Sequence, residues 1–119
     1  MIPHLKIQES IMSLQLLNSI SGFSGMEFGV FKLKEGSSEI EMLKAADAAD
    51  KKFLSKEDGF LGHAVLKGKD GLYVDLSFAT TKEKAEKICG KWMNNEFTLQ
   101  YIEFIDPESV DMSFWERIK

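Results

Sequence analysis

The chain has 119 residues, the length of one typical domain, and a formal net charge of −4. This acidic balance disfavours a nucleic-acid-binding protein, because contacts with phosphates need a basic face. No run of residues approaches the ~20 consecutive apolar positions of a membrane span, and the start of the chain lacks the basic segment of a signal peptide. The single cysteine, Cys89, excludes an intramolecular disulfide. We therefore expect a cytoplasmic protein with neither nucleic acid nor membrane as a partner.

Residues 1–25 are expected to form an accessory segment that precedes one domain over residues 26–119. Four apolar residues in this segment fall at helical spacing, which indicates a short amphipathic helix: Ile7, Ile11, Leu14 and Leu17. The Ser- and Gly-containing stretch Ser19–Gly25 that follows is typical of a linker.

The domain is predicted to begin with a strand over Phe28–Leu33, followed by a helix. Ser38 and Glu41 have the spacing of a capping box, in which the two residues satisfy free backbone N–H groups at a helix start. The predicted buried stripe of this helix is Met42, Ala46, Ala49 and Phe53.

A β-hairpin is predicted from Phe60–Lys67 and Leu72–Phe78. The loop Lys69–Gly71 has Gly at the position that needs a positive φ, and this loop pairs Gly68 with Leu72. The register separates two sets of side chains, and a slip of one residue would mix them. The apolar set, which we expect to pack against the helices, is Gly62, Ala64, Leu66, Val74, Leu76 and Phe78. The polar set, which we expect to lie on a bare sheet face, is His63, Val65, Lys67, Tyr73, Asp75 and Ser77.

A second helical region is predicted between Thr80 and Asp106. Thr80 and Glu83 form another capping box, and apolar residues continue at helical spacing to Ile105, with Asn94-Asn95 as a candidate interruption. Asp106-Pro107 ends the region, because the residue before proline is disfavoured in the α conformation. The alternation over Val110–Ile118 predicts a last strand.

The predicted order β–α–β–β–α–β indicates an α+β protein, a ferredoxin-like βαββαβ sandwich with an antiparallel sheet. Right-handed crossovers would place both helices on one face of that sheet.

Four segments carry a resemblance to a known family: Gly59–His63, Asp70–Asp75, Thr81–Ala85 and Phe104–Met112. From Met26 to its end the chain resembles the antibiotic-biosynthesis-monooxygenase-like family of dimeric α+β barrel proteins. The resemblance implies that two sheets pair face to face, so that the bare face is covered by a second copy in a homodimer. The family is functionally mixed: some members oxygenate aromatic polyketides without metal or flavin, some degrade haem, and some isomerise small metabolites.

The chain departs from the family at two places. Ala79 stands where members often carry a Trp, at the end of the strand after the hairpin. Residues 80–105 contain no His, whereas haem-degrading relatives use a helix His as the iron ligand. Neither a phosphate-binding loop nor a metal-binding motif is present, and we expect no cofactor and no metal.

The candidate catalytic residues are His63 and Asp75. The predicted register places His63 beside Ser77 and diagonal to Asp75, where it could act as a general base with a pKa near neutrality. Alternatively, His63 forms hydrogen bonds within a dimer interface.

The other candidates are substrate-binding residues. The last strand adds Asp111, Ser113, Trp115 and Arg117 to the polar face, which could line a pocket or form a subunit interface. Trp92 and Tyr101 could face a cavity between helix and sheet, where relatives hold ligands, or belong to the core. The predicted substrate-binding set is Tyr73, Ser77, Trp92, Tyr101, Trp115 and Arg117.

Two functions fit these observations. The first is a small-molecule-binding protein. More specifically, it would be a cofactor-independent monooxygenase or isomerase that acts on a small apolar or aromatic compound. The second is a non-enzymatic binding or assembly module whose polar sheet face only specifies the dimer.

Overall fold

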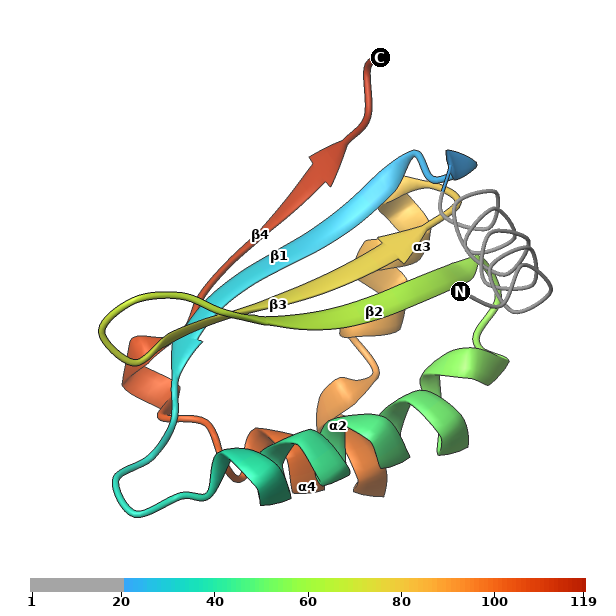
Figure 1. The fold of residues 1–119 in the computed structure, drawn as a ribbon. Helices are drawn as coiled ribbons and strands as arrows, with labels where there is room; N and C mark the ends of the chain where they lie inside the picture. Colours follow the sequence, from blue (N-terminus) through green and yellow to red (C-terminus); the bar gives the residue numbers. More distant parts are fainter. Residues whose placement is uncertain (1–20) are drawn as a thin grey trace, which may run out of the picture.

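The computed structural model describes residues 21–119, and the helix predicted around Ile7–Leu17 lies outside the described residues. The described elements follow the predicted order, with the second helical region divided into two helices (Figure 1). They are β1 (Gly25–Lys32), α2 (Glu39–Lys52), β2 (Phe60–Lys67), β3 (Leu72–Ala79), α3 (Lys82–Cys89), α4 (Glu96–Ile102) and β4 (Asp111–Glu116). The ferredoxin-like α+β fold is thus confirmed.

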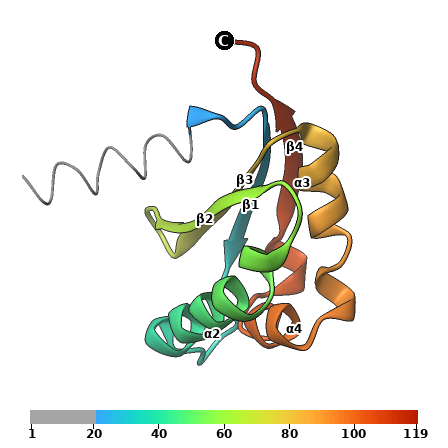
Figure 2. The ribbon, with the colours of Figure 1, turned by 90° about the vertical axis from the view of Figure 1, so that its right-hand side faces the viewer.

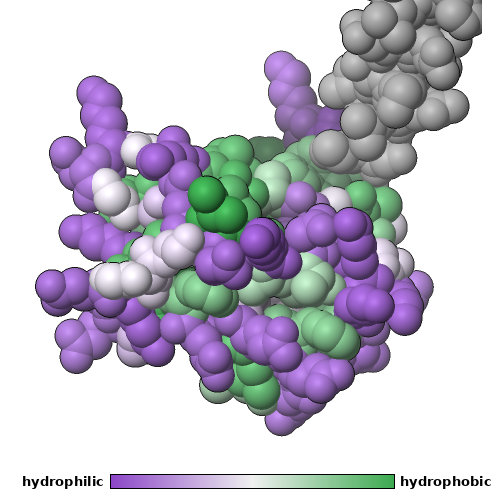
Figure 3. Space-filling view, turned by 60° about the horizontal axis from the view of Figure 1, so that its bottom comes forward, coloured by the Kyte–Doolittle hydropathy of each residue, from purple (hydrophilic) through white to green (hydrophobic). Residues whose placement is uncertain are grey.

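The four strands form one antiparallel sheet in the order β2-β3-β1-β4. Helices α3 and α4 lie on the same side of the sheet, and α2 lies beneath its β2 end (Figure 2). The outer surface of this helical side is covered largely by hydrophilic side chains (Figure 3). None of the helices within residues 21–119 has the length and apolar character needed to cross a membrane.

The predicted hairpin register is confirmed: His63 pairs with Ser77, and Val65 pairs with Asp75. The Gly68 N–H donates to the Leu72 carbonyl at 2.8 Å and closes the loop. The loop residue Gly71 has a φ of 78°, and Asp70 before it has a φ of 56°, so two residues adopt the left-handed conformation.

The helix caps were predicted well at one helix and with a shift of one residue at another. Ser38 accepts from the Glu41 N–H at 3.2 Å, as expected for the start of α2. Helix α3 is capped by Thr81, which accepts from the Lys84 N–H at 3.0 Å, so the predicted Thr80 cap was one residue early. Asn95 caps α4 and marks the predicted interruption.

The assignment of the two sheet faces was wrong, although the register was right. Tyr73, Asp75 and Ser77 are 7%, 5% and 8% exposed, because the helices cover them. Leu66 and Leu72, on the opposite face, are 48% and 39% exposed. His63, Tyr73 and Asp75 of the polar set are buried because each bonds to a residue of α2 or α4, as described below, which leaves the apolar set on the open face.

The last strand also divides the predicted polar face. Asp111, Ser113 and Trp115 pair with Val30, Phe28 and Met26, which alternate along β1 with its buried residues. On the covered face the core is built around buried residues of β1, α2, β3, α4 and the segment after α4: Phe31, Met42, Ala46, Tyr73, Tyr101 and Ile105.

Gly25 fixes the approach of α3 to the sheet. A Cβ atom at this position would lie 2.1 Å from the carbonyl oxygen of Thr81, the cap of α3. Because that neighbour is backbone, only glycine allows the first strand and the helix start to come this close.

Candidate active site

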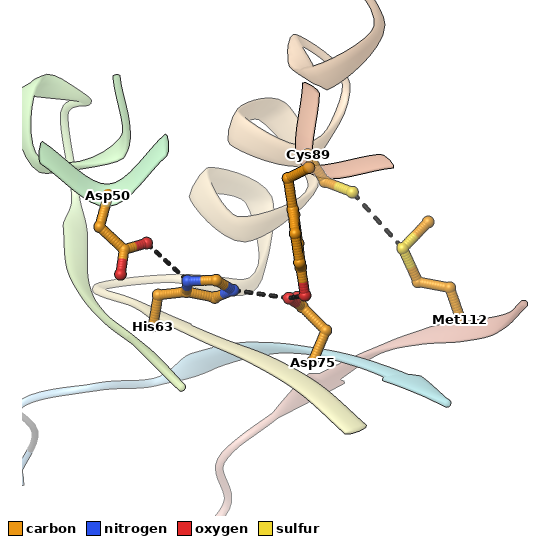
Figure 4. A network of polar contacts seen from close by, with 6 residues as sticks. Asp50, His63, Asp75, Cys89 and Met112 are labelled. Atoms are coloured by element: carbon orange, nitrogen blue, oxygen red, sulfur yellow. Dashed lines mark hydrogen bonds and ion pairs between the residues drawn. The ribbon is translucent and has the colours of Figure 1, made fainter. Parts of the chain in front are cut away.

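The centre of the site is His63, which lies on β2 between two carboxylates (Figure 4). Its Nδ1 lies 2.6 Å from Asp50 Oδ1, and its Nε2 lies 2.6 Å from Asp75 Oδ1. The imidazole side chain is only 1% exposed. Burial alone would lower the pKa of His63, but Asp75 and Asp50 outweigh it and raise the pKa to about 10. The ring is therefore an imidazolium at neutral pH and donates to both carboxylates.

Asp75 is the carboxylate that connects this ion pair with the helices. Its Oδ1 also accepts from the Tyr101 hydroxyl of α4 at 2.7 Å. Burial by itself would raise the pKa of Asp75, but the positive charge of His63 and the hydrogen bonds that the carboxylate accepts lower the pKa below its usual value. Asp75 is thus held ionised in the interior.

Glu27 of β1 is the second buried carboxyl group and is 2% exposed. Burial first, and then the negative charge of Asp75 and a hydrogen bond to it, raise the pKa of Glu27 to about 10. Two carboxyl groups in contact cannot both stay ionised, and here the proton belongs to Glu27 because Asp75 has the cation beside it. We call these two residues the carboxyl pair: a neutral acid and a carboxylate side by side.

Gly29 makes room for the carboxyl pair. Gly29 and Asp75 are direct neighbours across β1 and β3. A Cβ atom on Gly29 would lie 2.8 Å from Glu27 Oε1, too close for the present position of that carboxyl group. Gly29, two residues after Glu27 in β1, thus leaves the space that the Glu27 carboxyl group occupies.

A cavity of about 330 Å³ lies between the sheet and the helical layer, and the carboxyl pair forms part of its wall. Its volume falls within the range typical of small-ligand pockets. The rest of the lining is mostly apolar and comes from β1, β4 and the segment from α3 to the start of β4. The lining residues are Glu27, Gly29, Val30, Phe31, Asp75, Cys89, Trp92, Met93, Tyr101, Ile102, Ile105, Pro107, Val110 and Met112.

Four of the predicted site residues meet at this place. Trp92 and Tyr101 both line the cavity, and their ring centroids are 5.9 Å apart. The His63 ring packs edge-on against both, at 6.2 Å from Trp92 and 6.0 Å from Tyr101. Asp75 lines the cavity, whereas His63 lies behind it and is absent from the lining.

The other predicted residues lie elsewhere. Tyr73 donates from its hydroxyl to Glu39 at 2.6 Å and does not line the cavity. Ser77 borders a separate space of only about 10 Å³. Trp115 is 56% exposed on the open face. Arg117 donates to the carbonyl of Ser21 at 2.6 Å, beyond the end of β4.

Cys89 lines the cavity beside Met112, with the two sulfur atoms 3.5 Å apart (Figure 4). Burial, followed by the charges of Glu27 and Asp75, raises the pKa of the Cys89 thiol to about 12. Cys89 therefore remains a thiol at neutral pH. Because the thiolate is the reactive form of cysteine, Cys89 serves here as an apolar contact in the cavity wall.

Glu27 and Asp50 are the site residues that sequence reasoning missed. Glu27 had a usable signal: it alternates with Met26 and Phe28 in β1, and so belongs to the same face as Gly29. Asp50 had a weaker signal, because it lies four residues after Ala46 and three before Phe53, beside the predicted buried stripe of the helix. Among residues 21–119 no group of three or more His, Cys, Asp or Glu is arranged to hold a metal ion.

No protein-family model and no curated protein matches this chain. Solved structures do match. SnoaB from Streptomyces nogalater, a cofactor-independent oxygenase, has a TM-score of 0.62 at 12% identity, over 82% of this chain and 95% of its own. A protein from Bordetella bronchiseptica, provisionally described as an antibiotic biosynthesis monooxygenase, has a TM-score of 0.66 at 12% identity, over 82% and 99%.

A third structure, from Caulobacter crescentus and provisionally described in the same way, has a TM-score of 0.61 at 12% identity, over 87% of this chain and 97% of its own. The chain thus has the ferredoxin-like α+β fold of the antibiotic-biosynthesis-monooxygenase-like proteins, as the resemblance implied. At such low identity the likeness establishes the fold, so the function must be argued from the carboxyl pair and the cavity.

Proposed function

We propose that this chain is a small-molecule enzyme in which the carboxyl pair moves a proton on a substrate bound in the cavity. More specifically, we propose that the enzyme is a cofactor-independent monooxygenase that acts on a small apolar or aromatic compound. The observation that carries the proposal is an ionised Asp75 beside a protonated Glu27 in the wall of a mostly apolar cavity of about 330 Å³. Pairs of titratable groups whose pKa values are driven apart are typical of acid–base sites.

A neutral acid next to a carboxylate suits the enolisation of a ketone. Asp75 removes a proton from the carbon next to the carbonyl group, while Glu27 donates its proton to the carbonyl oxygen. The substrate becomes an enol, and the proton of the pair has moved from Glu27 to Asp75. Return of a proton to a different carbon would complete an isomerisation, so this first step serves both reactions that the family resemblance suggests.

Oxygenation requires one more reactant, O2, and no external reductant. The enol or its anion supplies the electrons: O2 adds to the activated carbon as a hydroperoxide, which then loses water. The overall change converts CH2 plus O2 into C=O plus H2O. The likeness to SnoaB supports this version, because that protein is described as a cofactor-independent oxygenase.

His63 and Asp50 take a supporting role in this proposal. The expected pKa of His63 near neutrality was wrong, because two carboxylates raise it to about 10. An imidazolium that donates from both nitrogens has no lone pair with which to act as a base. Instead it keeps Asp75 ionised and fixes its orientation, and Asp50 holds the ring from the other side.

The test uses anthrone, a planar aromatic ketone with an acidic methylene group, deuterated at that methylene. Exchange of deuterium into water without O2 reports enolisation, and O2 uptake reports oxygenation. We expect Asp75→Asn to lower both rates by a factor of about 10²–10⁴, the usual contribution of a general base. Glu27→Gln should lower them as well, because the acid proton is lost.

Asp47→Asn is the matched control, because it removes an exposed carboxylate of α2 without touching the cavity. Its rates should equal those of the wild type. Exchange by the wild type at the uncatalysed rate, with anthrone bound, would support the non-enzymatic binding module instead. Equal rates for Asp75→Asn and wild type would remove the carboxyl pair from the mechanism.

We also propose that a second copy of the chain covers the open sheet face. Support comes from its apolar side chains, since exposed Leu66 and Leu72 lie beside the part-buried Val74 and Leu76. Contiguous apolar surface of this kind marks interaction sites. Sedimentation should give a dimer at micromolar concentration, and Leu66→Glu should convert it to a monomer. A monomeric wild type would contradict this proposal.

A further inference from the structure

The charge of the cavity wall decides which ligands can enter it. Among the lining residues that residues 21–119 contribute, Glu27 and Asp75 are the only ionisable carboxyl groups, and none is Lys or Arg. The nearest cation, His63, is already bound on both nitrogens by Asp50 and Asp75. Two carboxylates and one imidazolium leave the network with an excess of one negative charge. A ligand carboxylate would meet this charge in an apolar environment without a partner.

Three buried polar atoms belong to residues that line the cavity, and outside the carboxyl pair they have no hydrogen-bond partner among the described residues. They are Asp75 Oδ2, Glu27 Oε2 and Trp92 Nε1. The proton that Glu27 carries joins the two carboxyl groups, whereas the Trp92 indole N–H has no acceptor among the described residues. Glu27 and Asp75 are 2% and 5% exposed, so bulk water does not satisfy them. Buried polar atoms left in this state are costly unless a ligand or a bound water pairs with them.

We infer that the cavity selects an uncharged, largely apolar compound with a hydroxyl or enol group next to a hydrogen-bond acceptor, and that it rejects carboxylates. The hydroxyl donates to the carboxylate of Asp75, and the acceptor oxygen receives the Glu27 proton or the Trp92 N–H. The aromatic rings of Trp92 and Tyr101 contact the apolar body of the ligand. This inference rests on the proposed function for its site and adds the class of substrate.

Three two-ring probes separate the possible outcomes: 2-naphthol, 2-methoxynaphthalene and 2-naphthoate. All have similar apolar bodies, but only the first has a neutral donor, and only the last is an anion at pH 7. Titration followed by NMR measures their affinities for the full chain. We expect 2-naphthol to bind about tenfold more tightly than 2-naphthoate, because a buried like charge without a partner is costly. The methoxy compound should lie between them.

Two variants test whether the negative charge of Asp75 causes the preference for 2-naphthol over 2-naphthoate. Asp75→Asn removes the negative charge at nearly constant shape, so the preference for naphthol over naphthoate should fall to about twofold or less. Asp47→Asn removes an exposed carboxylate of α2 that does not line the cavity, so its preference should equal that of the wild type. Circular dichroism confirms that each variant is folded, and the wild-type ratio alone tests the inference if Asp75→Asn does not fold.

Equal binding of naphthol and naphthoate to the wild type would overturn the inference, as would an unchanged ratio in folded Asp75→Asn. Failure of the proposed function gives a different result. If naphthol binds selectively but the protein does not catalyse anthrone exchange, the proposed enzymatic function is wrong and the inferred class of ligand is supported. If the protein catalyses anthrone exchange but binds naphthol and naphthoate equally, the proposed enzymatic function is supported and the inferred class of ligand is wrong.

Discussion

The two faces of the sheet are made by alternate residues of the same strands, yet they have opposite characters. In β3, Tyr73, Asp75 and Ser77 lie under the helices, while Leu72, Val74 and Leu76 lie on the open face. The covered face is the more polar of the two. Its polar groups belong to a network of ion pairs and hydrogen bonds, whereas the open face has exposed leucines. The comparison shows that charged groups can be buried beneath the helices when they form ion pairs, while apolar side chains of the same strand stay on the open face.

The largest effect is expected on the covered face, at His63. His63→Gln removes the cation and leaves Asp75 as a buried carboxylate without its main partner. We expect the free energy of unfolding at pH 7 to fall by about 3–5 kcal/mol, as for other broken buried ion pairs. Urea denaturation measures it.

Leu66→Gln is the matched control, because it makes the same residue type on the opposite face of the same strand. Leu66 is 48% exposed, so we expect a loss of about 1 kcal/mol or less under conditions where the chain is monomeric. A loss at Leu66 as large as that at His63 would contradict the comparison.

The pH dependence of stability is the next test. Glu27 and His63 have folded pKa values of about 10, above their ordinary values of 4.5 and 6.5. Each group binds its proton more tightly in the folded chain. The stabilisation by Glu27 is therefore complete below pH 4.5 and that by His63 below pH 6.5, and both are lost as the pH rises toward 10.

We expect the free energy of unfolding to fall between pH 5 and pH 9, by at most ~1.4 kcal/mol per pH unit for each of the two groups. Glu27→Gln should remove the decrease below pH 6.5 and about half of the decrease above it. Urea denaturation at pH 5, 7 and 9 checks this. A stability that rises with pH over this range would show that Glu27 is not the protonated member of the carboxyl pair.

A smaller effect is expected at Gly29, which makes room for Glu27. Gly29→Ala forces the Glu27 carboxyl group away from its place, since the new Cβ would lie 2.8 Å from Oε1. We expect a loss of about 1–2 kcal/mol, in the range for overpacked sites. Gly68→Ala is the control, because a Cβ atom there would make ordinary contacts from 3.5 Å outward. Thermal unfolding of both variants compares them, and equal midpoints would argue against the close contact.

The smallest effect is expected for a hydrogen bond on the open face. The Trp115 indole N–H donates to Ser113 Oγ at 2.8 Å, and Trp115 is 56% exposed. Ser113→Ala should change the free energy of unfolding by no more than about 0.5 kcal/mol, because water replaces the lost partner. A change above 1 kcal/mol in a chemical denaturation experiment would mean that this face is more ordered than its exposure indicates.

Most of the candidate site could be predicted from the sequence, and only Glu27 and Asp50 were missed. The register follows from the loop Lys69–Gly71, and it placed Asp75 and His63 on the same face because cross-strand neighbours are fixed once the turn is known. Asp50 could not be found this way. Its spacing from Ala46 and Phe53 places it beside the buried stripe of α2, but its contact with His63 depends on how α2 packs beneath β2.

The sequence by itself determined the order of the elements, the hairpin register and the cap of α2, because these depend on interactions between residues a few positions apart. Only the tertiary structure decided which face of the hairpin the helices cover. That choice depends on whether Glu27, Asp50, His63, Asp75 and Tyr101, from five different elements, satisfy one another in the interior. Such pairing is a property of the packed molecule, and it turned the apolar face outward.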